Sequence, residues 1–329
     1  MWGNDGFAGH ACCVPHSLFH LNQSYTMLKV TSNALQTTRL GGAPDETTSM
    51  FGPLTDLIGT WVGRKGWNLV AVPNQKGGFI LLVQPYTETL TITPLSTPTP
   101  NRGTHIVQQV PTLLYSLSIH SNVDGSLLHA ENGTWLLLQD CPDEFSIARQ
   151  ASVPHGDSLL ALGGSSVTPG APAIPDISTL PITGPGTKPL GYTDPYLTPM
   201  DGFNKVNPNA TLRDAIAGQT ITSTTSISVN TANKGGITNI PFIIQNANTT
   251  SFEATFWIET VKNPDTGGSF LQLQYSQTSI IEFIPQFHDP SRLIQWPHVN
   301  INTIEIMPVA QSSAALNVMR DLPRPLGAA

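Results

Sequence analysis

The feature that most constrains the fold is a two-residue period that returns along most of the chain after residue 59. In YTETLTI, Tyr86, Glu88, Leu90 and Ile92 alternate with threonines, and side chains two positions apart lie on one face of a β-strand. Further segments of this kind follow, among them SFEATFWIETV and FLQLQYSQTSIIEF, with little helical pattern between them. Consecutive strands favour an antiparallel meander, which removes its edges by closing. We therefore predict an all-β fold, an antiparallel meander β-barrel of about 8–10 strands that can hold one small ligand.

Turn signals place two of the strand boundaries. Asp124-Gly125 is a favoured hairpin turn, whereas Asn132-Gly133 is either a second turn or a bulge in one long strand. Before the first strand, Leu54 and Leu57 fit a short amphipathic turn. These signals fix where the chain reverses, but not which strands pair at a distance.

The first strand contains glycine. Alternation places Trp61, Trp67, Leu69 and Ala71 on one face, with Gly63 between them. A glycine inside a strand marks a bend or a close approach of another backbone. We therefore expect either a bend of the strand or a close backbone approach at Gly63.

Proline divides the chain. No periodic strand is compatible with the proline density of residues 164–208, and TLRDAIAG after it predicts a short helix with Thr211 as N-cap. We predict an N-terminal arm (1–50), one barrel domain (51–310) with an insertion (164–219), and a C-terminal tail (311–329). The insertion is too apolar for a free linker and is expected to lie against the barrel mouth, through Leu180, Ile182, Leu190, Tyr192, Tyr196 and Leu197.

Composition narrows the function classes. Only 11% of the residues are charged and the net charge is −7, so we expect neither a nucleic-acid partner nor an anionic membrane as partner. No apolar run reaches the ~18 residues of a membrane-spanning helix, and the N-terminus lacks the pattern of a signal peptide. Three cysteines cannot form a disulfide framework. A cytoplasmic protein, which could form a homodimer, is the expectation.

Several motifs together resemble one family. GPLTDLIGTWVGRKG is similar to the G-T-W-x-G-x-G opening of nitrobindin-type haem barrels, with one extra residue before the last glycine. LLHAENGTWLLL and ASVPHGDSLLALG resemble two later strands, and WPHVNINTIE resembles the last one. The chain also resembles bacterial and fungal proteins described as haem-binding or peroxidase-like. The resemblance covers about 52–163 and 220–307, and it implies a calycin or lipocalin-like barrel that binds haem b (heme b). The N-terminal arm and the insertion depart from the small nitrobindin barrel.

His298 is the main candidate ligand. From the residues alone it is either an ordinary histidine at the entrance of a strand or an imidazole restrained by Trp296-Pro297 for metal binding. The resemblance implies that it is the proximal iron ligand. Strict alternation puts Asn300 and Asn302 on the same face, which is unusual for an apolar pocket.

Other residues fill the remaining roles that the resemblance implies. His155 is the candidate catalytic residue on the distal side of the iron, although a surface-loop histidine is the alternative. The other candidate cofactor-binding residues, each of which is otherwise ordinary barrel structure, are Trp61, Gly63, Trp67, His129 and Tyr275.

The segment GHACCVPHSLFH resembles a zinc site only in composition. Its histidines and vicinal cysteines lack the spacing of common zinc fingers, so we expect no zinc there; the residues are His10, Cys12, Cys13, His16 and His20. Thiolate ligation of haem by Cys12 or Cys141 has no supporting context.

Three functions compete. The first is a haem b barrel with iron held by His298 that binds or transforms nitric oxide, peroxynitrite or peroxide, with binding favoured over peroxidase turnover. The second is a carrier of an apolar small molecule without iron. The third is an isomerase or cyclase that needs no cofactor. A Soret band in the purified protein discriminates between the first function and the other two.

Overall fold

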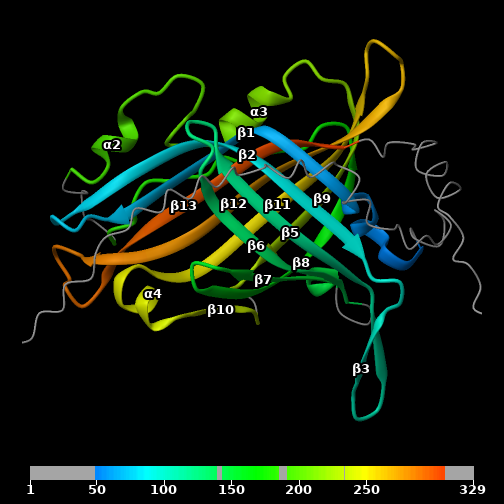
Figure 1. Cartoon of the computed structure of the whole chain (residues 1–329), viewed down its shortest axis with the longest axis horizontal. Helices are drawn as coiled ribbons and strands as arrows, with labels where there is room; N and C mark the ends of the chain where they lie inside the picture. Colours follow the sequence, from blue (N-terminus) through cyan, green and yellow to red (C-terminus); the bar gives the residue numbers. More distant parts are fainter. Residues whose placement is uncertain (1–48, 139–142, 185–190, 233, 308–329) are drawn as a thin grey trace, which may run out of the picture. The chain divides into compact units, whose positions relative to one another are not determined.

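Ten antiparallel strands close into a barrel (Figure 1). The computed structural model describes residues 49–138, 143–184, 191–232 and 234–307. In ring order, the barrel strands are β1 (Gly59–Pro73), β2 (Phe79–Pro94), β5 (Thr112–Ser121), β6 (Leu127–Leu137), β7 (Ile147–Val153), β8 (Asp157–Pro169), β9 (Ile221–Asn230), β11 (Asn248–Lys262), β12 (Ser269–Pro285) and β13 (Leu293–Ile306). Pairing of β13 with β1 completes the ring. The predicted all-β antiparallel barrel is confirmed.

Three strands lie outside this ring. β3 (Thr99–Arg102) and β4 (Val107–Val110) form a hairpin that projects from the barrel (Figure 1). β10 (Gly236–Asn239) pairs with the start of β8, whose later part pairs with β9. The helical elements are short: η2 (Gly52–Leu57), η3 (Asp143–Phe145), α2 (Asp194–Leu197), α3 (Asn209–Ala215) and α4 (Pro241–Asn246). Within the described residues, no helix has the length and hydropathy needed to cross a membrane.

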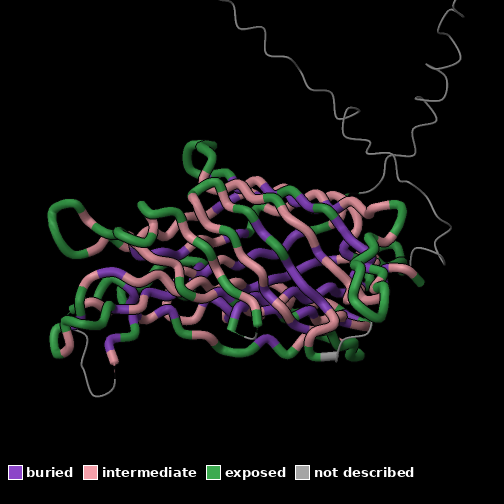
Figure 2. The backbone as a smooth tube through the Cα atoms, turned by 90° about the horizontal axis from the view of Figure 1, so that it is seen from below, coloured by how far each residue is buried: buried purple, intermediate pink, exposed green. Residues whose placement is uncertain are grey.

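The alternation builds the barrel interior. Buried and less buried residues alternate along the strands (Figure 2), and Tyr86, Glu88, Leu90 and Ile92 are all buried, as predicted. The η2 turn contributes Leu54 and Leu57 to the interior cluster that also contains Trp61. β6 runs without a break through Asn132-Gly133, so this signal is neither a turn nor a bulge.

A bulge in β1 reverses the direction of its side chains. Gly63 pairs with Glu88 and Gly66 with Tyr86, so β1 uses one residue more than β2 between these pairs. Trp61 therefore packs in the interior and Trp67 on the outer wall, and the prediction that they share a face is wrong. A Cβ on Gly63 would lie 2.7 Å from the backbone oxygen of Thr303, which confirms the close backbone approach.

The proline-rich insertion covers the outer wall. β8 continues to Pro169 and β9 begins at Ile221, so the excursion starts later than the predicted residue 164. Phe203 stacks on Trp67, with ring centroids 4.6 Å apart, and Tyr196 and Leu180 pack in the same outer cluster. The described part of the insertion packs against the barrel wall, whereas we predicted the barrel mouth.

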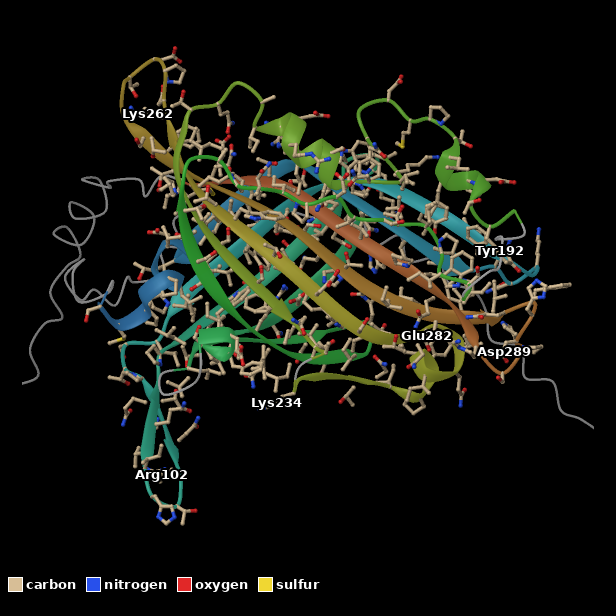
Figure 3. The ribbon with its side chains drawn as sticks, turned by 180° about the vertical axis from the view of Figure 1, so that it is seen from behind. Arg102, Tyr192, Lys234, Lys262, Glu282 and Asp289 are labelled. Carbon is tan, nitrogen blue, oxygen red and sulfur yellow. The ribbon has the colours of Figure 1, made fainter. Side chains whose placement is uncertain are left out.

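The insertion contains one helix that the sequence predicts. α3 confirms the predicted helix, but its N-cap is Pro208 and not Thr211. The ends of β1, β5, β7 and β12 lie at one end of the barrel, as their pairings require. Figure 3 shows Asp289, in the β12–β13 turn, at this end and Lys262, the last residue of β11, at the other. The division into arm, barrel domain and tail stays a prediction.

Candidate functional site

The histidine predicted as a ligand faces the barrel interior. Along β13 the inward positions are His298, Asn300 and Asn302, followed by Ile304, which belongs to the interior cluster. His298 Nε2 lies 2.7 Å from Asn68 Oδ1 on β1. Asn68 Nδ2 in turn donates to Gln84 Oε1 at 2.9 Å, so Nε2 of His298 is the donor in its bond. These side chains are only half-buried although they point inward, which places them towards the solvent-accessible end of the barrel.

His298 is uncharged at neutral pH. Desolvation inside the barrel, together with the charges that His129 and His155 would carry, lowers its pKa to about 3. The pKa of His298 therefore depends on the other two candidate histidines, His129 and His155. A neutral imidazole is the form that ligates a metal ion.

The other two histidines lie beside each other. The rings of His129, on β6, and His155, in the β7–β8 turn, have centroids 5.4 Å apart. Partial desolvation, followed by the effect of His129, lowers the pKa of His155. His129 Nε2 lies 3.3 Å from Glu131 Oε2, so a carboxylate orients its ring. His155 is exposed, whereas the side chain of His129 is 24% exposed.

Arg149 on β7 and Glu131 on β6 form a buried ion pair that the sequence analysis missed. Arg149 donates to Glu131 Oε1 at 2.7 Å and to Gln277 Oε1 at 2.5 Å. Its guanidinium lies 5.3–5.5 Å from the ring centres of Tyr115, Trp135, Phe252 and Phe256. Burial opposes ionisation of Glu131, but Arg149 and the hydrogen bonds from His129 and Tyr115 outweigh it and lower the pKa of Glu131 to about 2.

A second buried carboxyl group behaves in the opposite way. Glu88 is 1% exposed, and burial raises its pKa to about 7 despite hydrogen bonds from Tyr275 and Asn302. Tyr275 hydroxyl also lies 2.8 Å from the hydroxyl of Tyr86. The interior thus contains one ionised carboxylate, Glu131, and one carboxyl group that is largely protonated below neutral pH.

The predicted site residues divide into separate regions. The rings of His129 and His155 contact each other and both histidines influence the pKa of His298, whereas Tyr275 belongs to the Glu88 cluster deeper inside. Trp61 is fully buried in the interior core, and its Nε1 donates to Leu57 O at 2.8 Å. Trp67 lies on the opposite side of the wall, and Gly63 gives space to β13. A signal for the missed carboxyl groups existed: Glu88 and Glu131 occupy positions of inward-facing alternation.

Among the residues that the structure describes, no three His, Cys, Asp or Glu side chains are grouped so that they could hold a metal ion together. The residues that resemble a zinc site only in composition lie outside the described residues, and so does Cys141; they are His10, Cys12, Cys13, His16 and His20.

Comparisons with known proteins add little to this geometry. No protein-family model matches the chain, and no curated protein matches it. Among solved structures, the chain is similar to the crystal structure of Rv2717c from M. tuberculosis, with 13% identity and a TM-score of 0.40, over 80% of this chain and 98% of that chain. The assignment of the barrel rests on its strand pairings.

Proposed function

We propose that the solvent-accessible end of the barrel binds haem b, with His298 as the axial ligand and His129 and His155 on the ligand side. The observation that supports this function is the inward-facing, neutral imidazole of His298. Its pKa is influenced by His129 and His155, whose rings contact each other. Bound haem would supply an iron with an open axial position for nitric oxide, peroxynitrite or peroxide.

The donor set fits this group. His298 is neutral and restrained, as an axial ligand must be, and Val70 and Phe252 add apolar surface from neighbouring inward positions. The nitrogen that contacts Asn68 is Nε2, so ligation through Nε2 requires exchange of this bond. The residues of the chain would restrain the ring, hold it neutral and limit water around it.

Asn68 makes the experiment specific. The purified full chain is titrated with haemin and its Soret band is followed, for wild type, His298→Ala and Asn68→Ala. We expect His298→Ala to lose most of the haem, and Asn68→Ala to keep it, because removal of the amide frees Nε2. His120→Ala is the matched control, since His120 is exposed on β5. An unchanged Soret band in His298→Ala, or no Soret shift in the wild type, contradicts the proposal.

A second function is favoured by the two carboxyl groups with opposite pKa shifts. Such a pair is typical of acid–base chemistry without a cofactor, and the lining of this end includes Asn68, Gln84 and Gln277. An isomerase of a small polar molecule would show no Soret band and would depend on His129 and Glu131. The carrier of an apolar molecule stays a prediction, and binding of a fluorescent fatty acid by haem-free protein tests it. The homodimer also stays a prediction.

A further inference from the structure

The cluster around Glu88 connects three barrel strands. Tyr275 on β12 contacts Glu88 Oε2 on β2, and Asn302 on β13 donates to the same oxygen at 2.7 Å. The orientation of Asn302 is fixed, because its Oδ1 accepts from the backbone N–H of Thr303 at 2.8 Å. Its NH₂ group therefore faces Glu88 and has no alternative role as an acceptor.

The hydroxyl groups continue the cluster as a chain. Tyr275 hydroxyl lies 2.8 Å from Tyr86 hydroxyl, and Tyr86 hydroxyl donates to the carbonyl of Ile301 at 3.1 Å. A carbonyl oxygen can only accept, so the proton of Tyr86 is directed to Ile301. The contact between the two tyrosines must then use the proton of Tyr275.

Counting protons shows that one is missing. Three contacts join Glu88, Tyr275, Tyr86 and the Ile301 carbonyl, but the two hydroxyl groups supply only two protons. The third contact, between Glu88 and Tyr275, is complete if the carboxyl group donates. A protonated Oε2 is a hydroxyl oxygen, which donates to Tyr275 and still accepts from Asn302.

We propose that Glu88 is a proton-binding site of the barrel interior, and that its proton completes a directed chain from Glu88 through Tyr275 and Tyr86 to the Ile301 carbonyl. Loss of this proton at higher pH leaves a buried negative charge and one contact without a donor. The side-chain contacts that join β2 to β12 and β13 across the interior are thereby linked to pH.

The surrounding charges agree with this assignment. The titratable and charged groups that interact with Glu88 are Tyr275, Tyr86, Glu131 and Arg149. Arg149 is the cation among them, and it is already paired with Glu131. Burial is the largest influence and raises the pKa of Glu88 to about 7.

The direct test is carboxyl NMR of the full chain without added haem, with ¹³C-labelled glutamate and Glu88→Gln for assignment. We expect the Glu88 signal to be that of a neutral acid at pH 5.5 and to titrate near pH 7. If the signal is ionised at pH 5.5, the proposal is overturned, and the Tyr86 proton must be shared between Tyr275 and Ile301. Because haem is absent, the outcome is independent of the haem proposal.

Thermal unfolding of Glu88→Gln provides the second measurement. The amide oxygen accepts from Tyr275 and Asn302 as an ionised carboxylate would, but carries no charge. We expect the unfolding temperature of the variant to lie below that of the wild type at pH 5.5 and above it at pH 8.5. Glu253→Gln, at an exposed position of β11, is the control and should show no such crossing. Parallel curves for Glu88→Gln and wild type contradict the proposal.

Discussion

Strands β12 and β13 carry buried polar clusters on both faces, and the two clusters differ in how completely they are hydrogen-bonded. Inside the barrel, Tyr275 and Asn302 both reach Glu88. On the outer wall, beneath the insertion, Glu259 and Gln274 are 0% exposed, yet Oε1 of each lacks a hydrogen-bond partner among the described residues. A buried acceptor without a donor destabilises by about 1–3 kcal/mol. The interior cluster is complete when Glu88 carries a proton, whereas the outer one keeps two acceptors without a donor among the described residues.

Removal of the interior cation should have the largest effect. Arg149→Met leaves Glu131 buried without its cationic partner, and we expect a loss of about 3–5 kcal/mol in urea unfolding. The outer ion pair of Arg213 with Asp176 is exposed, so Arg213→Met should change little. Adding Glu131→Gln to Arg149→Met should recover part of the loss. Equal effects at Arg149 and Arg213 would remove the distinction between interior and outer wall.

The next effect concerns the anchor of the insertion. Phe203 is buried and stacks on Trp67, so Phe203→Ala should destabilise the protein by about 3 kcal/mol and speed proteolysis within residues 191–220. Leu197→Ala is the control, because Leu197 is 59% exposed. Unchanged proteolysis in Phe203→Ala would mean that other contacts hold the insertion on the wall.

A smaller loss is expected within the interior chain. Tyr275→Phe removes the hydroxyl between Glu88 and Tyr86 and should reduce the free energy of unfolding by about 2 kcal/mol. Tyr86→Phe removes the contacts with Tyr275 and with the Ile301 carbonyl but leaves Tyr275 in contact with Glu88, so it should have a smaller effect. If the two variants are equally stable, the directed chain does not contribute.

The smallest change should be a gain on the outer wall. Burial raises the pKa of Glu259 to about 7, above its ordinary value of 4.5. Ionisation therefore favours the unfolded chain, and stability from this group falls as pH rises from 4.5 through 7. Glu259→Gln should gain about 1 kcal/mol at pH 8 and nothing at pH 4. Thermal unfolding at both pH values checks this, and a gain at pH 4 would point to a cause other than the charge.

The sequence predicts the barrel well because burial follows a local rule. The alternation of Tyr86, Glu88, Leu90 and Ile92 places these residues inside without knowledge of their partners. The same rule does not predict the direction of the Trp67 side chain, because the bulge depends on how Gly63 and Gly66 pair with β2.

The site is predicted in part for a related reason. Histidine is a common metal ligand and acid–base residue, so the sequence alone identifies His129, His155 and His298 as candidates. The pairing of Arg149 with Glu131 joins different strands, and the sequence does not define that proximity. Likewise, the sequence of the insertion shows that the segment is apolar, but it does not show which face of the barrel the segment covers.

The closure between β1 and β13 means that the ring of strands has no structural beginning. Trp61 pairs with Ile306, and the backbone N–H of Met307 donates to the carbonyl of Thr60 at 2.7 Å. The two ends of the barrel segment are thus neighbours, close enough for a short peptide to join them. The hairpin of β3 and β4, whose residues are mostly exposed, offers a different place to open the chain. A circular permutant that starts there would keep every strand pair of the ring while changing the order in which the strands are synthesised.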